Sequence, residues 1–253
     1  MELPLTYRSQ AHPAIAFSRQ CTECELGKNC AVGGAGPDRL SEIKLIVVSD
    51  HPGHYEQECG YPFFDNAEQR RPRYNRKTGQ TSLEGWKNAG ALLRDQLGQQ
   101  FGLDTYRHCW LTNAVKCDPG KNKIKDKNAK TCALKWFCQE MAILDEAAPE
   151  VPILFAGSYA YKAIAYIDKE LSLKLGTSLR AHRLTNHWRW RAHPLVFTYN
   201  PAAVAKSEPR IETEIGLTLN QTYKVNKVQP LPPLVGSPQW MFARDLEMLR
   251  PFL

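Results

Sequence analysis

The sequence contains no long hydrophobic run, no leader-like N-terminus and no internal repeat. No stretch of about 18 consecutive apolar residues occurs, so we predict no membrane-spanning helix and no membrane partner. The first residues lack a basic start followed by an apolar block, which predicts a cytoplasmic protein without a signal peptide. Repeats and low-complexity tracts are absent as well, so we expect one globular domain spanning residues 1–253.

The composition is that of an ordinary globular protein with a modest basic excess. The 253 residues suffice for a large α/β domain, and a hydrophobic content of 43% is enough for a core. The formal net charge of +7 suits a polyanionic partner such as nucleic acid, although many basic proteins bind none. The eight cysteines are not expected to form disulfides in a reducing compartment. They are either buried apolar residues or metal ligands, and their spacing must decide which.

Apolar runs alternate with amphipathic stretches along the chain. The expected strands are 43–49, 110–113, 152–156 and 195–199, the last of them closing a hairpin over 182–199. The expected helices are about 87–99, 132–146, from 159 onward and 240–249. This alternation predicts an α/β fold with a central, mostly parallel, four-stranded sheet flanked by helices. The unpatterned stretches 65–86 and 206–238 are expected to be long loop insertions.

The spacing of the cysteines points to one metal site. Cys21 and Cys24 form a C-x2-C pair, which lets two thiolates reach one metal centre from a tight turn. The best candidates for the other half of the site are Cys117 and Cys132, with Cys138 as the competitor for Cys132. The candidate segments are therefore about 21–30 and 117–138. Cys30, Cys59 and Cys109 are expected to be small buried hydrophobic residues. The same is expected of Cys138 if it is not a ligand.

Polar residues follow two of the expected strands. Asp50 and His51 begin the turn after strand 43–49, and Asn113 ends the next strand. Loops at the carboxyl ends of strands in α/β sheets point side chains into the crevice where ligands bind. A lysine-rich loop follows Asn113, and an arginine-rich stretch surrounds Tyr74. These strand ends are therefore the predicted site.

Four features stand in a fixed order along the chain. They are the C-x2-C pair, a strand ending in Asp-x-Pro-Gly before Gly-x-Pro-Phe, Thr-Asn-x-Val-Lys-Cys with a later cysteine, and a strand followed by Asn-Pro-Ala-Ala. This order resembles the uracil-DNA glycosylase superfamily, most closely its iron–sulfur branch, family 4 and its relatives. The matching motifs lie at 49–53, 62–63, 89–93, 113–117, 156–160 and 200–203. The resemblance covers about residues 20–205 and implies a three-layer fold with the sheet between helices.

The resemblance also implies a cofactor and a DNA partner. Cys21, Cys24, Cys117 and Cys132 would hold a structural [4Fe-4S] cluster, although zinc would take the same four thiolates. In the family the cluster pins the N-terminal segment and the loop after the third motif. Lysines of that loop would then face DNA phosphates. The residues expected to contact DNA are Arg73, Lys116, Lys121, Lys123, Val204 and Lys206.

The activity that the resemblance implies is hydrolysis of an N-glycosidic bond after a nucleotide is taken out of the DNA stack. The departing base gains negative charge and needs hydrogen-bond donors, while the sugar gains positive charge and needs an anion or an oriented water. Phe63, with Tyr61 beside it, is expected to stack on the base, and Asn113 to read its polar edge. Asp50 is expected to orient the water or stabilise the sugar cation. His51 and His54 are expected to compensate in part for the histidine with which relatives support the leaving base.

Two departures from the family pattern bear on the substrate. Asn200 stands where relatives use a histidine to support the leaving base, and an amide donates a hydrogen bond but cannot become cationic. The inserts 65–86 and 206–238 would flank the base pocket and the strand channel. We therefore expect a modified or bulky pyrimidine, such as those in some viral DNAs, in preference to uracil. Small residues after the last motif, including Val204, predict a weak wedge in the duplex.

Other functions stay open at this point. One is a non-catalytic DNA-binding member of the same fold that has lost turnover with its histidine. Another is a variant that traps the abasic sugar covalently, but the basic loop ending in histidine that accompanies this in relatives is missing. Lysine is absent from the motif positions where it would form a Schiff base, so strand cleavage is not expected. The leading hypothesis is a monomeric, nucleoid-associated, monofunctional DNA glycosylase, for repair or for defence against foreign DNA.

Overall fold

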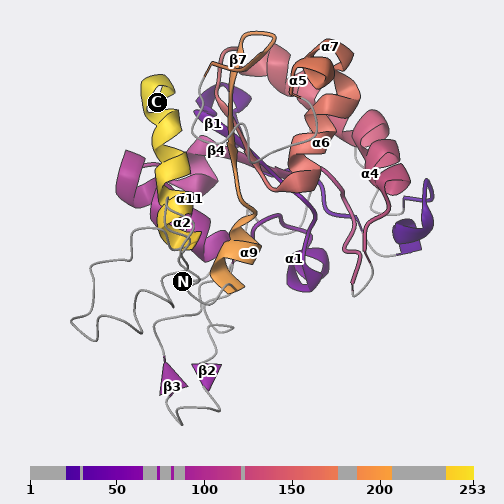
Figure 1. Ribbon diagram of the computed structural model, residues 1–253, viewed down its shortest axis with the longest axis horizontal. Helices are drawn as coiled ribbons and strands as arrows, with labels where there is room; N and C mark the ends of the chain where they lie inside the picture. Colours follow the sequence, from indigo (N-terminus) through magenta and orange to yellow (C-terminus); the bar gives the residue numbers. More distant parts are fainter. Residues whose placement is uncertain are drawn as a thin grey trace, which may run out of the picture.

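The computed structural model describes residues 21–28, 31–64, 73–74, 81–82, 89–120, 123–175, 187–206 and 238–253 (Figure 1). Its central sheet has five strands in the order β4-β1-β5-β7-β6. They are β1 (Leu45–Ser49), β4 (Cys109–Asn113), β5 (Ile153–Ala156), β6 (Arg189–Trp190) and β7 (His193–Thr198). A second sheet pairs β2 (Arg73–Tyr74) with β3 (Thr81–Ser82). Most of the expected insertions 65–86 and 206–238 lies outside the described residues.

The expected parallel sheet is confirmed, and its strand count is corrected from four to five. β1 pairs in parallel with β4 and β5, and β5 pairs in parallel with β7. The additional strand, β6, runs antiparallel to β7 and forms the expected hairpin with it. β6 is only two residues long, so it carries no apolar run from which a strand could be predicted.

Helices cover both faces of the sheet (Figure 1). The α-helices are α1 (His54–Cys59), α2 (Ala89–Phe101), α3 (Thr105–His108), α4 (Asp126–Cys132), α5 (Cys138–Ala147), α6 (Ser158–Ile167), α7 (Lys169–Leu175), α9 (Pro201–Lys206) and α11 (Pro238–Leu246). Short 3-10 turns are η2 (Glu25–Lys28), η3 (Leu40–Glu42) and η6 (Glu247–Phe252), and η5 (Ala133–Phe137) is a π-helical turn. Within the described ranges, no helix combines the length and the apolar character needed to cross a membrane.

The helix expected at 132–146 is three consecutive pieces and begins earlier, at Asp126. The lysine-rich run before Cys132 suggested a loop. In the structure the second half of this run forms α4, because Asn128 and Ala129 are buried on its inner side. Lys127 and Lys130 therefore project from a helix, whereas Lys123 and Lys125 lie before it.

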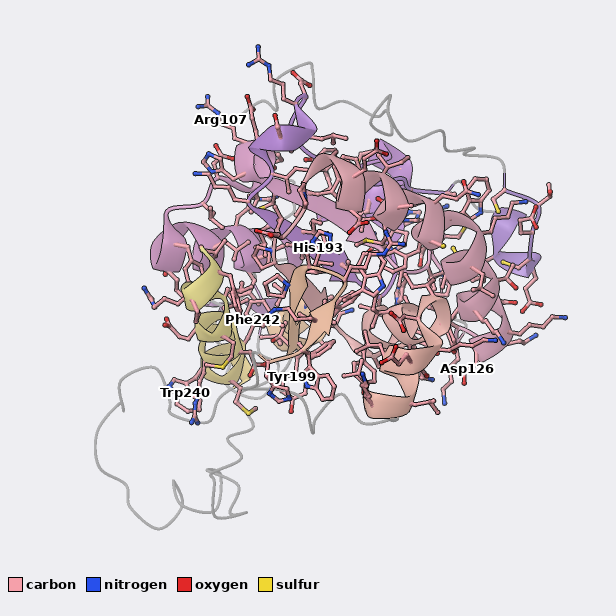
Figure 2. All side chains as sticks on the ribbon, turned by 90° about the horizontal axis from the view of Figure 1, so that it is seen from above. Arg107, Asp126, His193, Tyr199, Trp240 and Phe242 are labelled. Atoms are coloured by element: carbon pink, nitrogen blue, oxygen red, sulfur yellow. The ribbon has the colours of Figure 1, made fainter. Side chains whose placement is uncertain are left out.

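Alternate strand residues pack into two hydrophobic clusters, one on each face of the sheet. Val48 and Phe155 belong to the cluster that includes side chains of α5 and α6. Val47 and Leu111 belong to the cluster that includes side chains of α2 and α11. Phe242 of α11 is fully buried between its helix and the strands (Figure 2). The sheet is thus the middle of three layers, as the continuous apolar character of its strands predicts.

The outer edge of β4 is covered by the chain that precedes β1. The N–H of Ala35 donates to the carbonyl of Leu111 over 2.9 Å, and the N–H of Leu111 donates back over 2.7 Å. The N–H of Val32 donates to the carbonyl of Lys116 over 2.7 Å. These bonds satisfy an edge that would otherwise expose unpaired backbone groups. They also hold the N-terminal segment beside the loop that begins at Cys117.

A buried ion pair joins the end of β4 to α5. The ammonium of Lys116 and the carboxylate of Glu140 form a direct salt bridge, and both side chains are 1% exposed. Thr112 Oγ1 accepts from Lys116 over 2.6 Å and donates to Glu140 over 3.0 Å, while Trp110 Nε1 donates to Glu140 over 2.8 Å. The expectation that Lys116 contacts DNA is therefore wrong, because its charge is enclosed and already paired.

Replacing Glu140 with alanine is expected to lower the free energy of unfolding by about 3–5 kcal/mol, because it leaves the Lys116 ammonium buried without its partner. Urea denaturation followed by circular dichroism measures the change. Glu146→Ala, at an exposed position of the same helix, is the matched control and should change stability by less than about 0.5 kcal/mol. Equal effects of the two substitutions would show that the pair does not hold α5 to β4.

Candidate active site

The carboxyl ends of four neighbouring strands lie at one level of the sheet. Ser49 pairs with Asn113 of β4 and with Ala156 of β5, and Ala156 pairs with Thr198 of β7. Residues just beyond these ends are therefore brought together, as expected for an α/β sheet. Figure 1 shows α1 and α9, which follow β1 and β7, at this same end of the molecule.

Asp50 lies at the centre of this edge and is 8% exposed. Its Oδ1 accepts from the backbone N–H of Tyr159 over 2.6 Å and of Ala160 over 3.0 Å, in the first turn of α6. A carboxylate at a helix N-terminus is stabilised by the unpaired N–H groups and by the helix dipole. Gly157 makes this approach possible, since its φ is +123° and a Cβ there would collide with both carboxylate oxygens.

Asn200 connects Asp50 to the start of α9. Its Nδ2 donates to Asp50 Oδ2 over 3.0 Å, and its Oδ1 accepts from the N–H of Ala202 over 2.8 Å. Asn200 therefore caps α9 and orients the Asp50 carboxylate with one side chain. The structure brings together these two predicted residues, 150 positions apart in the sequence.

Asn113 offers an unused hydrogen-bond donor beside this pair. The residue is 1% exposed. In the part of the chain that the structure describes, its Nδ2 makes no hydrogen bond. A buried amide without a partner is uncommon and is expected to be satisfied by a ligand or water. The donor at the end of β4 is therefore available to the polar edge of a bound molecule.

Phe63 is held in an unusual backbone conformation. Its φ is +55°, a left-handed value that side chains rarely adopt. Its N–H donates to Glu56, and its carbonyl accepts from Arg94 Nη1 over 3.2 Å. Gly90 of α2 packs so closely that a Cβ there would collide with the Phe63 carbonyl. The rings of Phe63 and Tyr61 are 2% and 4% exposed and pack in the cluster of α2 and α11.

Glu56 was not recognised in the sequence, although it bridges two of the motifs. One carboxylate oxygen accepts from the N–H of Gly53 over 2.5 Å, and the other accepts from the N–H of Phe63. Desolvation of the enclosed carboxyl raises the pKa of Glu56 to about 7, although these two N–H groups oppose the shift. The only sequence signal was a glutamate at the third position of the short helix after Gly53, where it caps the helix.

The two histidines of the loop after β1 differ in surroundings. Nδ1 of the half-buried His51 lies 3.0 Å from the carbonyl of Pro52, so the ring turns toward its own loop. Nε2 of the exposed His54 lies 3.1 Å from a carboxylate oxygen of Glu58 on α1. No described contact joins either ring to Asp50 or Asn113 in the resolved part of this edge.

Four cysteines line one small cavity between the N-terminal segment and α4. They are Cys21, Cys24, Cys117 and Cys132. Apolar side chains, among them Leu26 and Trp136, complete the wall, and the N–H of Lys116 donates to Cys132 Sγ over 3.3 Å. Across the described ranges, no group of three or more His, Cys, Asp or Glu side chains is close enough to hold one metal ion.

The other cysteines lie away from this cavity. Cys109 is fully buried, as expected, and Cys59 is half-buried. Cys138 is exposed, which corrects the expectation of a small buried residue, and it is not among the residues that line the cavity. Cys30 lies outside the described residues.

Of the remaining residues expected to contact DNA, one is exposed, one is buried and the others lie outside the described part of the structure. Lys123 is exposed on the loop before α4. Val204 is 2% exposed and packs in the cluster of α2 and α11, so the expectation that it wedges into the duplex is wrong for this conformation. Lys121 and the side chains of Arg73 and Lys206 lie outside the described residues.

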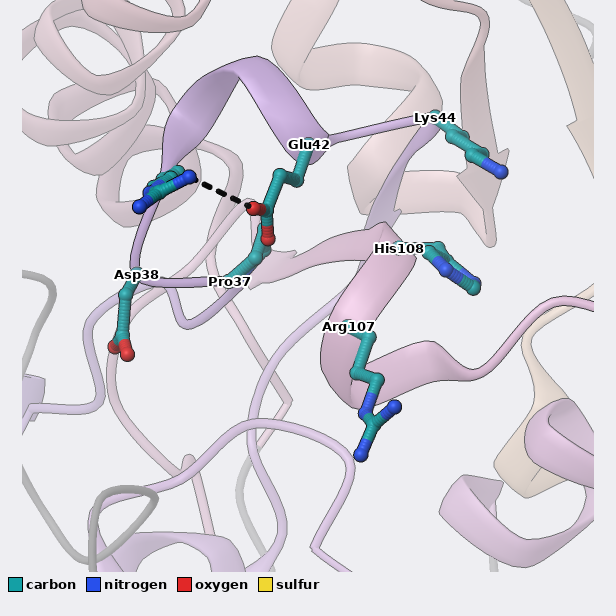
Figure 3. Close-up of a pocket in the computed structure, with 7 residues that line it drawn as sticks. Pro37, Asp38, Glu42, Lys44, Arg107 and His108 are labelled. Carbon is teal, nitrogen blue, oxygen red and sulfur yellow. Dashed lines mark ion pairs between the residues drawn. The ribbon is translucent and has the colours of Figure 1, made fainter.

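A larger hollow lies at the opposite edge of the sheet (Figure 3). It is lined by residues that precede β1 and β4, including Lys44 and His108, and it contains the exposed Arg39–Glu42 ion pair at 4.0 Å. These residues lie at the amino ends of the strands. Since none of the predicted site residues lines this hollow, it is separate from the candidate active site.

The raised pKa of Glu56 predicts a pH-dependent contribution to stability. Because its folded-state pKa is about 7 and its ordinary value 4.5, this contribution is fully present below about pH 4.5 and is lost as the pH rises through about 7. The free energy of unfolding of the native protein should therefore fall relative to that of Glu56→Gln, by about 2 kcal/mol between about pH 5 and pH 8. Urea titrations across this range measure the difference. Glu58→Gln, on the same helix but exposed, is the control and should follow the native curve. If the curve of Glu56→Gln ran parallel to the native curve, the raised pKa of Glu56 would be contradicted.

Comparison of the sequence with known proteins identifies its family. The sequence profile of the uracil DNA glycosylase superfamily matches residues 37–222, a range that includes Asp50, Asn113 and Asn200. The chain is 25% identical over 190 residues to the Type-4 uracil-DNA glycosylase of Pyrobaculum aerophilum, which covers 74% of this chain and 81% of that protein. Because the profile spans well over half of its length, the chain belongs to the uracil DNA glycosylase superfamily.

Proposed function

We propose that the protein is a monofunctional DNA glycosylase that extrudes a base from DNA and hydrolyses its N-glycosidic bond to leave an abasic site. The observation that carries the proposal is the pair formed by a buried carboxylate, Asp50, and an unused amide donor, Asn113, on adjacent strand ends. N-glycoside cleavage needs this combination, since the sugar becomes positive while the departing base becomes negative. Family membership and the similarity to a Type-4 uracil-DNA glycosylase support the same activity.

In this mechanism Asp50 acts on the sugar side. Its Oδ1 is fixed by two N–H groups of α6, so the carboxylate keeps its orientation while the base is extruded. It stabilises the developing sugar cation or orients the attacking water, which adds hydroxyl to the anomeric carbon and gives up a proton. A prepositioned anion needs no reorganisation during the reaction, which is the source of its effect.

Asn113 acts on the base side. The free Nδ2–H donates to a carbonyl oxygen of the extruded base, where negative charge gathers as the bond breaks. The same amide also carries an acceptor, so it distinguishes a base edge with adjacent donor and acceptor from other edges. Phe63, with its backbone fixed by Glu56 and Arg94, would form a flat wall for the base, with Tyr61 behind it. His51 would line the loop side of this pocket.

Asn200 gives a weaker leaving-group interaction than a histidine would. One of its donors is used by Asp50 and its acceptor by Ala202, so a single N–H is left for the base. A base that leaves more easily, or that brings further contacts of its own, would need less help. This supports a modified or bulky pyrimidine as substrate, with DNA of foreign origin as one source, and uracil as the alternative.

The cysteine cavity fits a [4Fe-4S] cluster. Four thiols face one space, and their wall is largely apolar. In such a cluster each thiolate binds a different iron, so the sulfur atoms lie around a volume, whereas zinc needs all four at about 2.3 Å from one point. Burial raises the pKa of Cys132 to about 11. Since a metal binds the thiolate, binding at this residue would release a proton. The cluster would be structural and would fix the loop between Cys117 and Cys132.

The test of the proposed activity is release of abasic sites from a panel of DNAs carrying uracil, mismatched thymine, hydroxymethylated or glucosylated cytosine, or ordinary bases. We expect release from one of these substrates and a fall of about a hundredfold or more in Asp50→Asn, which keeps the shape but removes the charge. Asp38→Asn, at the opposite edge of the sheet, is the matched control and should retain the native rate.

Three results would decide between this assignment and its alternatives. Rapid release of uracil with no action on bulkier bases would restrict the activity to plain uracil. Binding of DNA without release from any member of the panel would identify a non-catalytic DNA-binding member of the fold. A stable protein–DNA adduct on denaturing gels would reveal covalent trapping of the abasic sugar.

Removal of one cluster ligand gives an independent prediction. Native protein purified without oxygen should contain about four irons and about four sulfides per chain and absorb visible light. Cys117→Ser should lose both, because Cys117 is buried in the cavity wall, whereas Cys138→Ser should keep both. Zinc in place of iron, or loss of iron in Cys138→Ser alone, would contradict the ligand set.

A further inference from the structure

Tyr159 touches both the catalytic edge and the cysteine-bounded loop. Its backbone N–H donates to Asp50 Oδ1 over 2.6 Å, and its hydroxyl donates to the carbonyl of Ile124 over 2.6 Å. Ile124 lies between Cys117 and Cys132 and is itself 7% exposed. One residue in the first turn of α6 therefore reaches two segments of different function.

The loop has further attachments besides the hydroxyl of Tyr159. Its two ends are set by Cys117 and Cys132 in the wall of the cavity. Lys162, one turn after Tyr159, pairs with Asp126 over 2.8 Å and lies 5.4 Å from the centre of the Tyr159 ring. These contacts join the start of α4 to the start of α6.

The same loop carries the exposed lysine nearest to this attachment. Lys123 directly precedes Ile124 and its side chain is exposed. Lys125, on the other side, already pairs with Glu25 of the N-terminal segment over 2.9 Å. Of these two neighbours, Lys123 has its charge directed to solvent, where a DNA phosphate can bind it.

We infer that Tyr159 is a positioning residue that fixes the lysine-bearing loop in register with the Asp50 carboxylate. The inference rests on the proposed function, since it takes Asp50 as the catalytic anion and Lys123 as a phosphate contact. A phosphate bound at Lys123 is fixed relative to Ile124, and Ile124 is fixed through the tyrosine to Asp50. The phosphate contact thereby adds binding energy in the register that brings the sugar to its anion. Because the contact is the same before and during bond cleavage, its loss weakens binding of the DNA and leaves the rate of the bound complex nearly unchanged.

Tyr159→Phe tests this role, because it keeps the ring and the N–H to Asp50 and removes only the hydroxyl. The substrate is the DNA from which the native protein releases a base. For this DNA we expect KM to rise about three- to tenfold and kcat to change by less than about twofold. Amide hydrogen exchange at 123–128 should become faster while exchange in β1 stays unchanged. Tyr166→Phe, on the same helix and packed against the same cluster, is the matched control and should change neither quantity.

A double substitution separates positioning from general loosening. If Tyr159 acts through the phosphate contact, Tyr159→Phe should have little further effect on KM in a Lys123→Ala background. Additive effects, native KM and exchange in Tyr159→Phe, or equal changes in Tyr166→Phe would each overturn the inference.

The inference can fail separately from the proposed function. If the native protein released no base from any DNA, the proposed activity would fail, but equilibrium binding to the same DNAs would still be measurable. Weaker binding and faster loop exchange in Tyr159→Phe, together with a shallower dependence of affinity on salt, would then support the loop-positioning role. Native binding and native exchange would overturn it.

Discussion

The candidate site depends on the hydrogen bonds that the carboxylate of Asp50 accepts. This carboxylate joins the end of β1 to the first turn of α6 and, through Asn200, to the start of α9. Each of these segments follows a different strand, so the anion sets how three strand ends are arranged. The arrangement requires a residue without a side chain at Gly157, where the backbone enters α6 with a φ of +123°. A side chain at that position would displace the anion before it affected the sheet.

A second set of contacts supports this edge from the side of the cysteines. The N-terminal segment pairs with β4, and the buried salt bridge from Lys116 to Glu140 ties the end of that strand to α5. Asn113 lies between these two attachments in the chain. Its amide is therefore held in place by backbone pairing on one side and by an enclosed ion pair on the other. The proposed reading of a base edge by Asn113 needs this fixed position, because a mobile amide would bind several base edges equally well.

The sequence was sufficient for the strands and for the residues at their ends. The runs that became β1, β5 and β7 are largely apolar, and Asp50, Asn113 and Asn200 lie at or just beyond the ends of strands, so parallel pairing brings them together. Lys116 and Val204 were misjudged because their burial depends on partners far along the chain, Glu140 and the cluster of α2 and α11. Glu56 and Tyr159 were not recognised, since their roles are hydrogen bonds to backbone atoms, which leave no pattern in residue types.

The π-helical turn η5 has a consequence for how this chain can change in evolution. It follows Cys132 directly and continues into α5. One continuous helical segment therefore contributes Cys132 to the cysteine cavity and then side chains to the main core. A π turn holds one residue more than an α turn, and each residue of an α-helix advances the direction of the side chains by about 100°. Deleting a single residue there would rotate α5 and carry Glu140 away from Lys116. The length of this one turn thus keeps Cys132 and Glu140 on the sides of the helical segment where their contacts lie, and the segment tolerates substitution more readily than a change of length.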